Sequence, residues 1–128
     1  MQSGIQINIP NIVVPNGFAI YGVNQMSTYI DVETNDDLFK VNNPNSYGIQ
    51  ITIADFQATV VPGYNPNSLF NWRDPKQNGQ VLIVQHVNGS GNGWVNGTLY
   101  LENLANIVAF DHERYGTGLN ILNCNYFM

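Results

Sequence analysis

The residue types that could do chemistry are few: two histidines, one cysteine and nine carboxylates. Nucleophilic catalysis needs a serine or cysteine activated by a histidine, and neither His86 nor His112 stands in such a motif. Cys124 lies in an apolar run, which favours a buried thiol. His112 belongs to the run Asp-His-Glu-Arg at 111–114, which is typical of a solvated turn with a local ion pair. We therefore expect no catalytic residue and predict that the protein is not an enzyme.

The carboxylates also define no site. A pair of them could hydrolyse a glycosidic bond, but nothing in their spacing brings two together. The candidates for such a pair are Asp55, Asp74, Glu102, Asp111 and Glu113, and a small hydrolase using Asp111 or Glu113 is the weakest alternative. A zinc site needs ligands that converge from at least two segments, and a calcium loop needs a glycine-spaced pattern that 33–37 lacks. The sequence therefore predicts no metal and no cofactor.

The stretch HVNGSGNGWVNGTLYLENL, 86–104, is rich in glycine. A phosphate-binding glycine loop leads into a helix, whereas this one leads into strand-like residues. Asn-Gly pairs are instead typical of the tight turns of β-hairpins, so we expect two reversals here. The aromatic and amide side chains have the chemistry of sugar binding, although Trp and Tyr suit subunit contacts equally well. Under the alternative interpretation of a carbohydrate-binding domain, the predicted ligand contacts are Trp72, Asp74, Asn92 and Trp94.

Charge is scarce along the whole chain. Only 10% of the residues are charged, against roughly 25% in an ordinary soluble domain. The four basic residues form no cluster and the net charge is −5, which argues against binding to nucleic acid or to an anionic membrane surface. Asparagine takes the place of charge, with 20 Asn against 2 Lys. Uncharged polar groups keep a surface hydrated without repulsion between identical subunits.

Alternation of β-branched and polar residues recurs along the chain, and no window has a convincing helical period. Strands are expected at 5–9, 18–23, 28–33, 38–41, 48–61, 80–87, 97–104 and 119–127. The strand at 48–61 is long enough to bend near Ala54-Asp55. Short strands separated by Asn, Gly and Pro predict an all-β fold, an antiparallel β-sandwich of which the eight-stranded jelly roll is one form. We find no internal repeat, linker or second domain, so residues 1–128 are expected to form a single β-sandwich domain.

Both termini carry large apolar residues. Near the N-terminus, isoleucines alternate with polar residues and two prolines follow, which keeps a strand out of the interior of a sheet. Residues 1–16 are therefore predicted to be an N-terminal arm or an edge strand. The chain finishes in three large apolar residues, which are unusual in a free tail. The predicted subunit contacts are Ile5, Ile7, Ile9, Tyr126, Phe127 and Met128.

These features favour a structural subunit that assembles with copies of itself. A virion coat, decoration or fibre protein fits best, with other coat proteins as further partners. The expected location is a virion or an extracellular assembly, reached without a cleaved signal peptide because MQSGIQINIP lacks a basic segment followed by an apolar one. No stretch of roughly 18 apolar residues is present, so membrane insertion is not expected. The alternative is a carbohydrate-binding, lectin-like β-sandwich domain with a glycan as partner.

Overall fold

A computed structural model gives the arrangement of most of the chain. It describes residues 3–7, 12–13, 17, 19–22, 28–41, 49–75, 79–90, 93–110 and 119–127. The described residues form twelve strands in two sheets.

The larger sheet has the strand order β1-β4-β6-β8-β10-β12, and β3 also pairs with β6. Its strands are β1 (Ser3–Ile7), β3 (Ala19–Tyr21), β4 (Thr28–Val32), β6 (Gln50–Val60), β8 (Val81–Ser90), β10 (Asn106–Phe110) and β12 (Tyr126–Phe127). The smaller sheet has the order β11-β9-β7-β5-β2. Its strands are β2 (Ile12–Val13), β5 (Phe39–Val41), β7 (Phe70–Arg73), β9 (Leu99–Glu102) and β11 (Leu119–Leu122).

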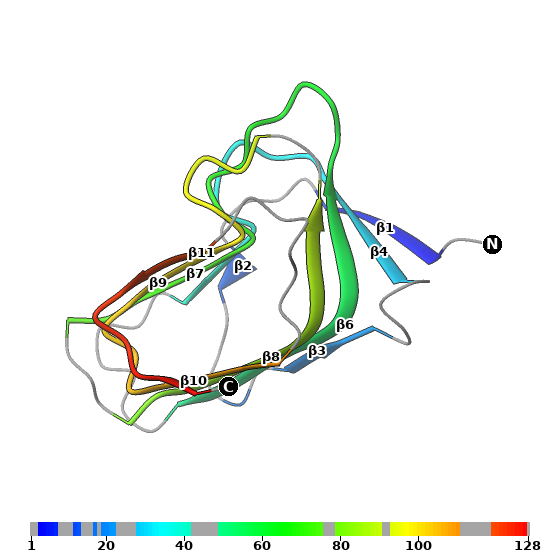
Figure 1. Ribbon diagram of the computed structural model, residues 1–128. Helices are drawn as coiled ribbons and strands as arrows, with labels where there is room; N and C mark the ends of the chain where they lie inside the picture. The colour runs from blue at the N-terminus through cyan, green and yellow to red at the C-terminus, as the bar shows by residue number, and fades with distance from the viewer. Residues whose placement is uncertain are drawn as a thin grey trace.

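Every strand pair in the two sheets is parallel, so the predicted antiparallel sandwich or jelly roll is wrong. Parallel strands need a long return connection, which in most proteins is a helix. Here the return path is a strand of the other sheet: from β4 to β12 the chain alternates between the sheets at every step. Successive coils therefore stack on one another, which is the topology of a parallel β-helix (Figure 1).

The two hairpin reversals predicted within 86–104 are absent for the same reason. β8 runs on through Ser90, and the next strand, β9, pairs with β7 rather than with β8. Two glycines between these strands, Gly93 and Gly97, have φ values of 109° and 92°. These positive φ values, which glycine adopts without strain, let the chain turn at the corners where it crosses from the larger sheet to the smaller one.

Like residues stack in rows because each coil repeats the register of the previous one. In the smaller sheet, Phe39 pairs with Phe70 and Phe70 pairs with Leu99. In the larger sheet, Ile51, Leu82 and Ile107 form an equivalent row. All these side chains are buried, and neighbours in a row are about 4.8 Å apart, the spacing of strands in a sheet.

The two longest strands, β6 and β8, bend in the middle, so that the larger sheet covers two sides of the core (Figure 1). The bend in β6 falls at Asp55, where φ is 63°, close to the position predicted from the sequence. The neighbouring residue on β8 is His86, whose φ is 50°. Both adopt the left-handed region, which Asp and His tolerate better than most residues.

Gly89 lies in β8 where the two sheets approach each other. A Cβ atom there would come within 2.7 Å of the Oγ1 of Thr98, the residue before β9. We expect Gly89→Ala to lower the free energy of unfolding by about 1–3 kcal/mol, the usual cost of overpacking. Thr98→Ala removes the obstructing atoms and should recover most of that loss in the double variant. Urea denaturation of the four proteins measures the coupling, and strictly additive effects would contradict the contact.

Candidate functional site

The tryptophan predicted to contact a ligand on β7 belongs to the core. Trp72 is fully buried, and its ring packs edge-to-face on Phe70 with centroids 6.4 Å apart. Its Nε1 donates a hydrogen bond of 2.8 Å to Oδ2 of Asp74, so the structure brings these two predicted site residues together. A sugar stacks on an exposed ring face, and Trp72 offers none.

Trp94 is also buried, with 6% of its surface exposed. Its Nε1 has no hydrogen-bond partner among the described residues. The fourth predicted ligand contact, Asn92, lies outside the described residues. Neither indole ring is therefore exposed enough to stack on a sugar.

The predicted contact residues near the termini lie on edge strands. The backbone of Ile5 and Ile7 pairs with β4, and that of Tyr126 and Phe127 pairs with β10. β1 and β12 are the first and last strands in the order of the larger sheet. Ile9 and Met128 fall outside the described residues. Both terminal segments thus pair with their own chain, and each leaves one strand side facing outward.

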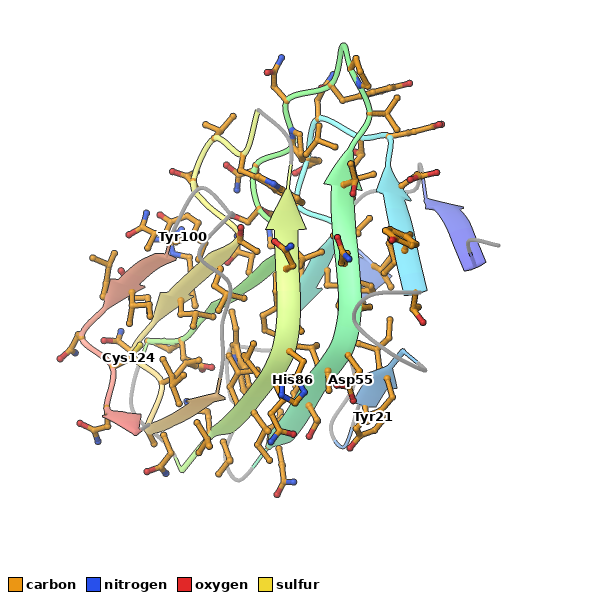
Figure 2. The ribbon with its side chains drawn as sticks, turned by 45° about the vertical axis from the view of Figure 1, so that its right-hand side comes forward. Tyr21, Asp55, His86, Tyr100 and Cys124 are labelled. Carbon is orange, nitrogen blue, oxygen red and sulfur yellow. The ribbon has the colours of Figure 1, made fainter. Side chains whose placement is uncertain are left out.

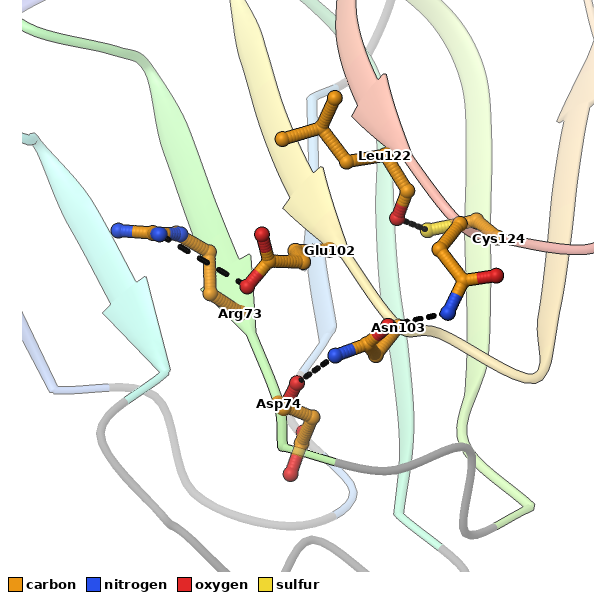
Figure 3. A network of polar contacts seen from close by, with 7 residues as sticks. Arg73, Asp74, Glu102, Asn103, Leu122 and Cys124 are labelled. Atoms are coloured by element: carbon orange, nitrogen blue, oxygen red, sulfur yellow. Dashed lines mark hydrogen bonds and ion pairs between the residues drawn. The ribbon is translucent and has the colours of Figure 1, made fainter.

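Asparagines bridge successive coils at the corner that follows the smaller sheet. Asn103 and Asn123 have φ values of 59° and 51°, a region that Asn adopts readily. The Nδ2 of Asn123 donates to Oδ1 of Asn103 at 2.6 Å, and the Nδ2 of Asn103 donates to the carbonyl of Asp74 at 2.5 Å. Figure 3 shows Asn103 reaching Asp74 from the next coil. We call this series the exit ladder.

A second series of polar side chains lies at the corner that precedes the smaller sheet. The Nδ2 of Asn96 donates to Oδ1 of Asn67, and the Nδ2 of Asn67 donates to Oδ1 of Asp37 at 2.5 Å. Asn71 donates to the other oxygen of Asp37 at 2.9 Å. Buried Asp37 therefore has amide donors on both carboxylate oxygens, which is what a buried carboxylate requires. We call this series the entry ladder.

A third pair of side chains joins coils at the bend of the larger sheet. Asp55 Oδ1 lies 2.9 Å from His86 Nδ1, and both side chains are partly exposed (Figure 2). A carboxylate that orients an imidazole also occurs in hydrolytic sites, but those require a nucleophile beside the ring. Among the residues that the structure describes, no group of three or more His, Cys, Asp or Glu could hold a metal. Like Asn103 and Asn123 of the exit ladder, both residues have positive φ values and their side chains meet across neighbouring coils, so the pair acts as a link between coils.

Cys124, the residue after Asn123 of the exit ladder, forms hydrogen bonds with the backbone. Cys124 Sγ donates a hydrogen bond to the Leu122 carbonyl at 3.3 Å (Figure 3). It also accepts one from the Leu104 amide at 3.3 Å. Burial raises the pKa of the Cys124 thiol above its ordinary value, and the backbone hydrogen bonds oppose that rise. The protonated thiol is a poor nucleophile, so this cysteine is suited to packing.

The outer face of the smaller sheet carries a polar cluster. The Cζ of Arg73 lies 4.8 Å from the centroid of the Tyr100 ring, and its guanidinium is 3.7 Å from the Glu102 carboxylate (Figure 3). The ion pair is partly exposed and contributes little to stability. Arg73 covers one face of the Tyr100 ring, so that face is not available to stack on a sugar.

Three of the four exposed large apolar side chains in the described part of the chain lie on edge strands, a feature that the sequence pattern did not predict. Among the described residues they are Val13 (64% exposed), Tyr21 (65%), Val95 (67%) and Leu122 (42%). Val13 lies on β2 and Leu122 on β11, at opposite edges of the smaller sheet, and Tyr21 lies on β3 at an edge of the larger one. Alternation along a strand cannot identify these residues, because the edge position of a strand depends on long-range pairing. The three residues on edge strands, Val13, Tyr21 and Leu122, form the candidate functional surface, whereas Val95 lies outside the strands.

Comparison with protein-family models, with curated proteins and with solved structures gave no match. Within the described part of the chain, no helix is long and apolar enough to cross a membrane.

The exit ladder can be tested at Asn103. We expect Asn103→Ala to lower the free energy of unfolding by about 2–3 kcal/mol, because it removes two hydrogen bonds and places alanine in the left-handed region. Asn103→Gly keeps the backbone conformation and should lose less. Asn120→Ala, on the outer face of β11, is the matched control and should change stability by less than about 0.5 kcal/mol. Equal losses at positions 103 and 120 in thermal denaturation would show that the ladder carries no stability.

Proposed function

We propose that the protein is a structural subunit that assembles with copies of itself, as a component of a virion coat, decoration or fibre or of another extracellular assembly. The observation that carries the proposal is the placement of exposed apolar side chains on edge strands at both sides of a stack of parallel coils. Soluble proteins usually protect such edges with charge, proline or a covering segment.

The scarcity of charge supports the same function. Two copies of a chain with many like charges repel one another on contact, and this chain has only 13 charged residues. The side-chain ladders are largely uncharged, so stacking adds little electrostatic cost. An assembly of this kind depends on apolar and backbone contacts, and we expect it to tolerate high salt.

The experiment is sedimentation velocity of the purified chain over a range of concentrations, together with edge variants. The wild type is expected to form oligomers whose size rises with concentration. Val13→Glu places a negative charge on the edge strand β2. The new carboxylate lies beside Lys40, with which Val13 is paired, so the single subunit should stay folded. The charge opposes pairing with another strand, so the affinity between subunits should fall at least tenfold.

Val95→Glu is the matched control, since Val95 is equally exposed but lies outside the strands. It should leave assembly unchanged. A wild type that stays monomeric to high micromolar concentration would refute the proposed function, and so would equal effects of the two glutamate variants.

A further inference from the structure

The two edges of the smaller sheet differ from each other because all its strands point the same way. β2 forms one edge and β11 the other. An identical copy, moved along the stack without being reversed, would continue the sheet with the same parallel pairing. We propose that the chain assembles head to tail, with β11 of one copy pairing in parallel with β2 of the next; this inference rests on the proposed function.

The backbone groups at both edges are oriented for that pairing. On β2, the Ile12 amide donates to the Leu38 carbonyl at 2.9 Å, so the backbone of Ile12 faces β5 and that of Val13 faces outward. On β11, the Leu122 carbonyl accepts from the Asn103 amide at 3.0 Å, so the backbone of Leu122 faces β9 and that of Ile121 faces outward. Each edge therefore presents donors and acceptors away from its own sheet.

The register of the contact follows from the rows of the sheet. The backbones of Ile12, Phe39, Phe70, Leu99 and Leu119 pair in one row, and the first four of these residues turn their side chains toward the core. Continuing that row places Ile12 of the next copy beside Leu119, and Val13 beside Asn120. The Val13 amide then meets the Leu119 carbonyl, and the Ile121 amide meets the Val13 carbonyl. The register that continues the core is thus one that also matches donors with acceptors.

The larger sheet agrees with the same translation. β12 pairs with β10, and β3 pairs with the first half of β6, so both are edges of the same half of that sheet. Moving a copy along the stack brings β3, with exposed Tyr21, toward β12. A single translation of the second copy therefore covers the exposed apolar residues on β2 and on β3 at the same time. This agreement between the two sheets favours a second copy as the partner at these edges.

Disulfide trapping tests the proposed orientation. Cys124→Ser gives a background without thiols, in which Val13→Cys and Asn120→Cys are made separately. Within one chain these positions are four strand spacings apart, about 19 Å, which no disulfide can span. We expect rapid cross-linked dimers on mild oxidation of the mixed proteins and few from either protein alone. The double variant should give a ladder of multimers on a non-reducing gel.

The alternatives give different results, with assembly checked by sedimentation of the same samples. Dimers from Val13→Cys alone, at a rate equal to that of the mixture, would show that like edges meet and would overturn the head-to-tail arrangement. Assembly without mixed cross-links would overturn it too, while leaving the proposed function intact. Absence of any assembly would refute the proposed function and this inference together.

A proline variant tests the backbone contact. Val13→Pro removes an amide that faces away from its own sheet, so circular dichroism and the melting temperature should match the wild type. The protein concentration at which half of the chains are assembled should rise about tenfold. This is the loss of affinity expected when the Leu119 carbonyl of the neighbouring copy is buried without a donor. Val13→Thr keeps the amide and a β-branched side chain and should assemble like the wild type. Unchanged assembly in Val13→Pro would overturn the contact through β2.

Discussion

Parallel pairing alone determines most of what is distinctive in this structure. A chain that forms only parallel pairs must return to the same end of the sheet before each new strand, and here it returns as a strand of the other sheet. Every coil then turns at the same places, so corners stack on corners and inward residues on inward residues. The rows that contain Phe70 and Leu82 are buried for this reason, and the same stacking places Asp55 beside His86.

The stacked corners also account for the use of asparagine. A row of identical charges about 4.8 Å apart would be strongly repulsive, whereas amides can donate to one neighbour and accept from another. Asn103 does both within the exit ladder, and Asn67 does both within the entry ladder. Asparagine also tolerates the left-handed conformation that a sharp corner needs. Asparagine in the two ladders thus meets a requirement of the stacked coils, and it also keeps the surface hydrated without charge.

Some of this fold could be predicted from local sequence. The segments expected at 28–33, 38–41 and 48–61 are close to β4, β5 and β6, because alternation records which side of a strand is buried. Strand direction could not be predicted, because alternation is the same in parallel and antiparallel sheets. The repeat was also hidden, since 31, 29 and 20 residues separate Phe39, Phe70, Leu99 and Leu119. Among the predicted site residues, Trp72 and Asp74 do meet, but the exposed Val13 edge has no local signal.

The constraint that orders the core also determines where a partner can bind. Stacked coils pair every interior strand on both sides, so in the described part of the chain the outward-facing backbone groups lie on the strands at the two edges of each sheet. Charge at those positions would oppose association, and Val13 and Tyr21 are apolar instead. Because the strands share one direction, the two edges are complementary rather than identical, so repeated contacts between them are heterologous. Such contacts give a filament or a closed ring, according to the rotation between successive copies.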